Sequence, residues 1–144
     1  LLGQVLFESG AGLRAIPSYE TAVLLAPEEP LIRVGLAKVQ ISINQSPLNR
    51  SGIKHLKFAL NLKPDIISGW RQLAIAYGRE KQLGQSSLAS AELALRLGQK
   101  KDAYRHAVRA KKILPMGQPA RVRTLDILRI IKGKDVLERS HKIN

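Results

Sequence analysis

Cysteine is absent from this 144-residue chain, and aromatic residues make up only 4% of it. The lack of cysteine excludes disulfide bonds and cysteine-ligated zinc, but it leaves the redox compartment open, because an oxidising space permits disulfides without requiring them. No apolar run approaches the roughly 20 residues that a membrane-spanning helix needs, so we expect no transmembrane segment. The chain begins Leu-Leu-Gly-Gln, with neither a Met nor a basic region leading into an apolar one. We therefore expect it to be an internal segment of a longer protein.

Motifs for catalysis and cofactor binding are also missing. The three histidines, His55, His106 and His141, do not form an H-E-x-x-H motif, and neither Gly-rich phosphate-binding motif occurs. His55 and His106 occupy the same relative place on two predicted helices, which favours a structural or surface role over metal ligation. We expect no enzyme activity, no metal site and no cofactor in this chain.

Acidic residues are scarce compared with basic ones: 11 Asp and Glu face 24 Lys and Arg, which gives a net charge of +13. Residues 98–144 hold 13 of the basic but only 4 of the acidic residues, so this last third carries +9. Such asymmetry indicates an acidic partner, an anionic membrane surface or nucleic acid. A solvated helix face is the simpler interpretation. Nucleic acid is not expected, because aromatic residues that stack on bases are nearly absent from this third.

A repeating helical pattern is what the sequence does contain. One face of a helix over residues 70–79 collects Trp70, Leu73, Ala74 and Tyr77. The same four places 34 residues earlier hold Leu36, Val39, Gln40 and Ile43, with the polar Gln40 as the poor match. This spacing and this period are typical of the first helix of a tetratricopeptide (TPR) repeat.

We therefore predict an all-α fold, namely a TPR-type α-solenoid of antiparallel helix pairs with about eight helices and a C-terminal capping helix. The array is predicted over residues 1–132, and residues 133–144 are predicted as a tail or short helix. Within the array we expect repeats near residues 1–30, 31–66 and 67–97, an irregular half-repeat at 98–115 and the capping helix at 118–132. Pro27, Pro64 and Pro115 are expected to end helices, as are Gly10, Gly98 and Gly133.

A binding groove follows from this architecture, because the first helices of successive repeats line the concave surface on which solenoids bind peptides. The predicted peptide-binding residues lie beside the packing stripe: Phe7, Ile41, Asn44, Arg71, Ile75 and Arg79. Arg71 and Arg79, with Asn44 one repeat away, offer planar donors for a carboxylate or a peptide carbonyl. The alternative, that these arginines are ordinary solvated residues, is equally compatible with the sequence.

Three stretches, residues 70–79, 88–92 and 114–128, resemble the C-terminal TPR region of periplasmic HExxH-type zinc metallopeptidases of Gram-negative, especially alphaproteobacterial, bacteria. The resemblance implies a non-catalytic region that recruits or shelters outer-membrane protein clients and adjoins an N-terminal peptidase domain. It also implies a periplasmic location, with any zinc outside this segment. Arg121 departs from the aromatic residue expected after Pro-Ala, which puts the packing of the last helix in question.

Two functions stay open at this point. The first is a protein–protein interaction module that binds an extended or helical segment of a client. The second is a stand-alone scaffold whose basic C-terminal end binds lipid headgroups or nucleic acid. The dependence of binding affinity on salt concentration distinguishes the two functions, because phosphate binding weakens steeply with added salt, whereas binding in an apolar groove is much less sensitive.

Overall fold

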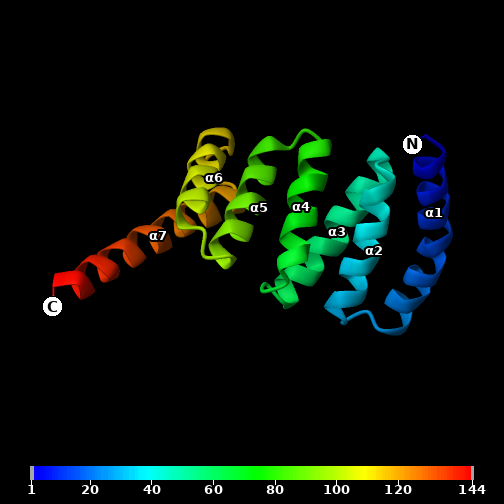
Figure 1. Cartoon of the computed structure of the whole chain (residues 1–144), viewed down its shortest axis with the longest axis horizontal. Coiled ribbons are helices and arrows are strands. Elements are labelled where there is room, and N and C mark those ends of the chain that lie inside the picture. Colours follow the sequence, from blue (N-terminus) through cyan, green and yellow to red (C-terminus); the bar gives the residue numbers. More distant parts are fainter. Residues whose placement is uncertain (1, 144) are drawn as a thin grey trace. The chain divides into compact units, whose positions relative to one another are not determined.

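The computed structural model describes residues 2–143, with side chains from Gly10 onward. This part of the chain contains seven α-helices and no strand (Figure 1). The helices are α1 (Leu2–Leu25), α2 (Pro30–Ile43), α3 (Ser46–Leu62), α4 (Ile67–Arg79), α5 (Leu83–Arg96), α6 (Lys100–Ile113) and α7 (Pro119–Ile143). The predicted all-α class is confirmed, but the described residues form seven helices where about eight were predicted.

The difference in helix number arises in α1, which continues through Gly10, where a helix end was predicted. A glycine inside a helix costs about 1 kcal/mol relative to alanine, but it does not force the helix to stop. Pro17 also lies inside α1 rather than in a first turn, although proline removes one backbone hydrogen bond there. Packing on α2 favours the continuous helix: a Cβ atom on Gly12 would lie 3.4 Å from Cγ1 of Ile43.

The prolines mark helix ends as predicted. α1 ends at Leu25, two residues before Pro27, while Pro64 and Pro115 lie in the connections that follow α3 and α6. Proline cannot continue a helix, because it lacks the backbone N–H group and its ring clashes with the preceding turn. Gly98 follows α5 with a φ of +71°, the left-handed conformation that glycine commonly adopts after a helix.

Gly133 does not end a helix, contrary to the prediction of a capping helix followed by a tail or short helix. α7 runs without interruption from Pro119 to Ile143, in orange to red in Figure 1. Gly133 is exposed, and no atom lies within 4 Å of a Cβ built on it. Nothing in its surroundings therefore forces the backbone out of the helical conformation.

The helices group into two compact units, Leu1–Lys81 and Gln82–Asn144, here called the N-terminal unit and the C-terminal unit. Within the N-terminal unit each helix packs against the next one, and α2 also contacts α4. Within the C-terminal unit α6 packs against both α5 and α7, and α5 also contacts α7. The short loops inside each unit make successive helices antiparallel neighbours.

The repeat-signature residues of α4 are only partly buried. Leu73 and Tyr77 are 5% and 7% exposed, as a packing stripe requires, whereas Trp70 and Ala74 are half-buried. The indole Nε1 of Trp70 donates a hydrogen bond of 2.7 Å to the carbonyl oxygen of Pro64. Trp70 therefore fastens α4 to the turn that precedes it, in addition to packing along the helix.

Glycines allow the helices of the N-terminal unit to approach closely. Gly35, Gly52 and Gly69 lie where α2, α3 and α4 each meet the preceding helix. The Cβ atoms that alanine would add there would lie 2.7 Å, 2.9 Å and 2.9 Å from side-chain carbons of Tyr19, Ile41 and Leu60, respectively. These distances are shorter than ordinary carbon contacts, so a larger residue would require the neighbouring side chains to shift, and glycine lets the helices pack at this spacing without such a shift.

Small residues also shape the core of the C-terminal unit. One face of α6 carries Ala103, Ala107 and Ala110, all 0% exposed, and α7 contributes Ile127 and Ile131 to the same cluster. An alanine face lets both neighbouring helices pack close to α6. The opposite face of α6 is left with larger side chains, and these form the site described next.

Candidate functional site

The predicted peptide-binding residues on α4 are partly available. Arg71 is exposed, and no carboxylate lies within ion-pair distance of it among the described side chains. Ile75 follows one turn later and is 40% exposed. The structure therefore brings these two residues together as a small patch, part cationic and part apolar, on α4.

Arg79 and Ile41 have structural roles that sequence reasoning did not anticipate. Nη1 of Arg79 donates to the backbone carbonyl oxygen of Ile41 at 2.5 Å, so its guanidinium joins α4 to the end of α2. The Ile41 side chain is only 2% exposed and packs at the Gly52 crossing. The prediction that Ile41 lines an open groove is wrong, because its side chain belongs to the core.

Asn44 and Phe7 complete the predicted set. Asn44 is exposed at the C-cap of α2 with φ 57° and ψ 49°, and its Oδ1 accepts a hydrogen bond of 3.3 Å from Nδ2 of Asn49. Asparagine tolerates this left-handed conformation, which explains its place at the helix end. The side chain of Phe7 lies outside the described residues.

A cavity of about 920 Å³ lies between α6 and α7, beside the loop that joins them. Its apolar floor consists of Tyr104 and Val108 from α6 and Leu128 and Ile131 from α7. Tyr104 is 56% exposed, although aromatic residues are usually covered in a folded chain. We call this cavity the α6–α7 groove.

Basic side chains border the groove. Lys111 and Lys112 lie at its loop end, and Lys132 of α7 lies further along. All three are exposed, and the described residues offer none of them a carboxylate within ion-pair distance. The rim therefore holds positive charge that the described part of the chain does not neutralise. The one acidic lining residue, Asp135, pairs with Lys100 at 3.0 Å.

Arg121 closes the loop end of the groove and answers the question that its sequence position raised. Its Nη1 donates to the carbonyl oxygens of Lys111 and Leu114, the latter at 2.9 Å. Lys111 lies in the last turn of α6 and Leu114 is its C-cap, and backbone acceptors there have no partner within the helix. Arg121 thus caps α6 from α7, a polar contact where an aromatic residue was expected.

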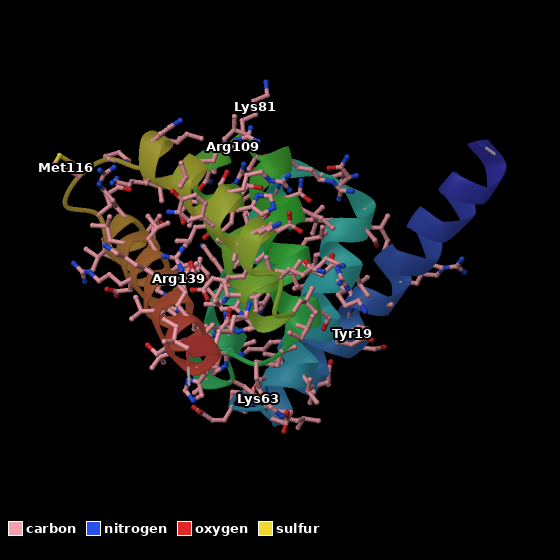
Figure 2. All side chains as sticks on the ribbon, turned by 60° about the vertical axis from the view of Figure 1, so that its left-hand side comes forward. Tyr19, Lys63, Lys81, Arg109, Met116 and Arg139 are labelled. Atoms are coloured by element: carbon pink, nitrogen blue, oxygen red, sulfur yellow. The ribbon has the colours of Figure 1, made fainter. Side chains whose placement is uncertain are left out.

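A smaller cavity of about 430 Å³ lies on the same exposed face of α6. It shares Tyr104, Val108 and Lys112 with the α6–α7 groove and adds Arg105 and Arg109. Arg105 pairs with Asp102 at 2.9 Å, whereas Arg109 has no ion pair among the described residues. Figure 2 marks Arg109 on this helix and Met116 on the loop that follows it. An apolar ridge on α6 is therefore flanked by cations on both sides.

A buried ion-pair cluster fixes α7 in the C-terminal unit. Glu92 of α5 is 3% exposed, and its carboxylate accepts from Nε of Arg123 at 2.6 Å, from Nη2 of Arg123 at 3.0 Å, and from Arg96. Burial alone would raise the pKa of Glu92, but the hydrogen bonds from Arg123 and Arg96 outweigh it and hold the pKa below the ordinary 4.5. The carboxylate therefore stays ionised and ties α7 to α5.

His55 lies in a structural cluster with Arg33. Arg33 donates from Nε to the carbonyl oxygen of Pro27 at 2.9 Å, and its guanidinium lies 3.8 Å from the ring centroid of Phe58. Its Nη1 lies 3.3 Å from Nδ1 of His55, so that nitrogen acts as the acceptor of a neutral imidazole. Burial and the positive charge of Arg33 lower the pKa of His55, against a smaller opposing effect of Glu20. In the part of the chain that the structure describes, no group of three or more His, Cys, Asp or Glu side chains is placed to hold a metal ion.

Sequence reasoning missed the α6–α7 groove, because it placed the binding surface on the first helices of the repeats and treated residues 98–115 as an irregular half-repeat. A signal was present: Tyr104, Val108 and Lys112 recur every four residues, opposite the buried alanines. Such spacing places a second, partly apolar stripe on the helix. What the sequence does not contain is the position of α7, which supplies the second wall.

Comparisons with known proteins do not assign the chain to a family. No protein-family model matches the sequence, and no curated protein is similar to it at a significant level. Among the described helices, none combines the length and the apolar character that crossing a membrane requires.

Proposed function

We propose that this chain is a non-catalytic protein-interaction module that binds an extended or helical segment of a partner protein. The observation that carries the proposal is the α6–α7 groove, which combines a concave apolar floor with exposed cations at its rim. Apolar clefts with a few convergent polar groups are the usual form of binding sites. An exposed Tyr104 next to half-buried Val108 and Leu128 offers contact area for apolar side chains.

A TPR-type arrangement of the helices belongs to the same proposal. The close-contact glycines fall at positions 35, 52 and 69, an interval of 17 residues that is half of the 34-residue TPR period. Contacts between α2 and α4, and between α5 and α7, also fit helix pairs stacked in series. Both observations support the array predicted from the Trp70 pattern.

The resemblance to periplasmic zinc metallopeptidases extends this proposal to a biological setting. It would make the chain the C-terminal region of a secreted peptidase in outer-membrane protein quality control, with outer-membrane proteins as clients. Reading the coding sequence upstream of Leu1 tests this part. We expect a secretory signal and an H-E-x-x-H motif there, and an upstream region without that motif would contradict it.

The second candidate function is binding of an anionic surface, either lipid headgroups or nucleic acid. The observation that favours it is the group of exposed basic residues that border the two cavities and have no ion-pair partner among the described side chains, namely Arg109, Lys111, Lys112 and Lys132. Their concave apolar surroundings favour a protein segment instead, because a phosphate surface does not fill an apolar groove. Steep loss of binding with added salt would favour the anionic surface.

An array of immobilised peptides taken from unfolded protein sequences tests the proposed function. We expect the labelled chain to bind a subset rich in apolar residues, and calorimetry of one bound peptide then locates the site. Lys111→Glu with Lys112→Glu should weaken binding, whereas Arg71→Glu with Ile75→Asp tests the face predicted on α4. If only the α4 pair weakens binding, that face is the site. If no peptide is retained above an albumin background, the proposed function is wrong.

A further inference from the structure

We infer that the α6–α7 groove selects protein segments in which apolar residues lie between two carboxylates. This inference rests on the proposed function and adds the chemistry of the ligand. It follows from the order in which cations and apolar side chains succeed one another along the groove.

The first step is the charge of the rim. Lys111 and Lys112 at the loop end, and Lys132 on α7, are exposed and have no carboxylate partner among the described side chains. Arg121 borders the groove as well, but its guanidinium is held by two backbone carbonyls of α6. The lysines are therefore the groups available to a ligand, and they attract carboxylates rather than cations.

The second step is the floor. Tyr104, Val108, Leu128 and Ile131 present only carbon atoms and one phenol group to the ligand. A segment made of acidic residues alone would leave this floor exposed to water, whereas apolar side chains would cover it. The ligand must therefore place apolar residues at its centre.

The third step is the spacing. Arg121 contacts the carbonyl of Lys111 and so marks the loop end of the groove on α7. From Arg121 to Lys132 the helical rise of about 1.5 Å per residue gives about 16 Å. An extended chain covers that length in about five residues. The two carboxylates of the segment should thus be about five residues apart, with apolar residues between them.

Asp135 does not oppose this assignment. Its carboxylate lies beside the amino group of Lys100, which also contacts Glu138 at 2.7 Å. Two carboxylates share this one amino group, which leaves a net charge of −1 at the cluster against +3 on the three lysines, so the groove as a whole stays positive.

The test uses three synthetic peptides and fluorescence anisotropy. The first carries four apolar residues between two glutamates, the second replaces both glutamates by glutamine, and the third has the same composition with the glutamates adjacent at its centre. We expect the first to bind about tenfold more tightly than the other two, because only it can pair with lysines at both ends of the floor. Equal binding of all three would overturn the inference and leave the proposed function standing.

Matched variants locate the effect. Lys111→Glu with Lys112→Glu, and separately Lys132→Glu, should each weaken binding of the first peptide by about fivefold or more, since each reverses charge at one end. Lys54→Glu with Lys57→Glu makes the same change of charge on exposed residues of α3 and should leave binding unaltered. Circular dichroism confirms that each variant is folded. If the α3 pair weakens binding as much as the rim pair, the effect is one of net charge and the inference fails.

Vesicles of anionic phospholipid and single-stranded DNA serve as competitors. We expect neither to displace the first peptide at moderate salt, because neither fills the apolar floor. Displacement by either would overturn the inference in favour of a phosphate-bearing ligand.

Discussion

Glu92 is a buried carboxylate in the C-terminal unit that two arginines pair with. Its carboxylate is buried, and two guanidinium groups hold it ionised. We expect Glu92→Gln to destabilise the unit by about 1–3 kcal/mol, because the hydrogen bonds from Arg123 and Arg96 lose their charged acceptor. Urea denaturation followed by circular dichroism measures this difference. Stability equal to that of the wild type would show that the cluster contributes nothing.

Acid should affect Glu92 in a definite direction. A folded-state pKa below the ordinary 4.5 means that the stabilisation is present above pH 4.5 and is lost as the pH falls through the folded-state pKa. As the pH is lowered below 4.5, the urea concentration at the denaturation midpoint should therefore fall more steeply for the wild type than for Glu92→Gln. Parallel pH profiles of the two proteins would contradict the assignment.

Trp70 is less buried than the repeat pattern predicts. Its spacing with Leu73 and Tyr77 predicts a buried aromatic residue, whose removal would cost about 3–5 kcal/mol. The structure leaves Trp70 half-buried, with its Nε1 on the carbonyl oxygen of Pro64. We now expect Trp70→Ala to cost about 2 kcal/mol and Trp70→Phe about 1 kcal/mol, since phenylalanine keeps the packing and loses the hydrogen bond. Equal melting temperatures of wild type and Trp70→Ala would show that neither contact matters.

Gln40 illustrates a residue whose environment the repeat pattern could not predict. The repeat pattern predicts a small apolar residue at this position, but the position holds the polar Gln40. Its side chain is 3% exposed, and its Nε2 donates to Oγ of Ser51 at 3.0 Å. A polar pair across two helices is visible only once α2 and α3 are in place. Sequence periodicity identifies the buried face, but it does not identify Ser51 as the hydrogen-bond partner of the buried amide group of Gln40.

At the scale of the element, close helix contacts depend on single glycines. In the C-terminal unit α5 approaches the end of α6 at Gly84, where an added Cβ would lie 2.7 Å from Cδ2 and 2.9 Å from Cγ of Leu114. Leu114 is buried and cannot move away freely. We expect Gly84→Ala to destabilise the unit by about 1–3 kcal/mol through overpacking.

Gly133→Ala is the matched control for this substitution, because Gly133 lies inside α7 and a Cβ added there would meet no atom of another element within 4 Å. Alanine there should stabilise the helix by about 0.5–1 kcal/mol, since it restricts the unfolded chain without a clash. Thermal melting of both variants gives the comparison. A stabilising Gly84→Ala would mean that the two helices are not in close contact.

Helix ends were predicted correctly at three prolines and at Gly98, but not at Gly10 or Gly133. Proline at 27, 64 and 115 excludes a continuing helix, so those three ends followed from the sequence. Gly10 and Gly133 merely weaken a helix, and packing or an open environment decided that α1 and α7 continue. The difference is one of energy and surroundings: the roughly 1 kcal/mol of an internal glycine is readily offset by neighbours, and α1 shows that even the roughly 3 kcal/mol of an internal proline is offset at Pro17.

At the scale of the whole molecule, the high positive charge makes stability sensitive to further protonation. Protonation of His55 and His106 adds to a net charge that is already +13. Burial is the first cause that lowers the pKa of His55 and of His106, and Arg33 and Arg105 lower it further. Both pKa values lie below the ordinary 6.5. The free energy of unfolding that depends on neutral His55 and His106 is therefore fully present above pH 6.5, and it is lost as the pH falls through their folded-state pKa values.

We expect the melting temperature to fall between pH 7.5 and pH 5, and to fall less in a His55→Gln, His106→Gln variant. Differential scanning calorimetry at a series of pH values checks this. Glu20 raises the pKa of His55 and Asp102 raises the pKa of His106, which limits the size of the effect. A wild-type melting temperature that rises towards pH 5 would contradict the sign.

The candidate site was predictable only in its composition. The excess of basic residues after residue 98 was evident from the sequence, and it is these residues that border the α6–α7 groove. The sequence pattern instead placed the groove on the helices that hold Phe7, Ile41 and Arg71, and Ile41 proved to be buried. A concave site needs two walls, and the second wall depends on how α7 packs, which no local pattern along α6 contains.

The continuous course of α7 has a consequence for its own local stability. Thr124, Ile127 and Ile131 are buried in the unit, whereas Val136 and Leu137, which lie beyond Ile131 on the same helix, are 58% and 61% exposed. Amide protons around Ile127 should therefore exchange with solvent only when the whole unit opens, while those after Gly133 should exchange through fraying of the helix end. Trypsin would cut first in the frayed part, and the shortened helix would still carry every residue that packs into the core.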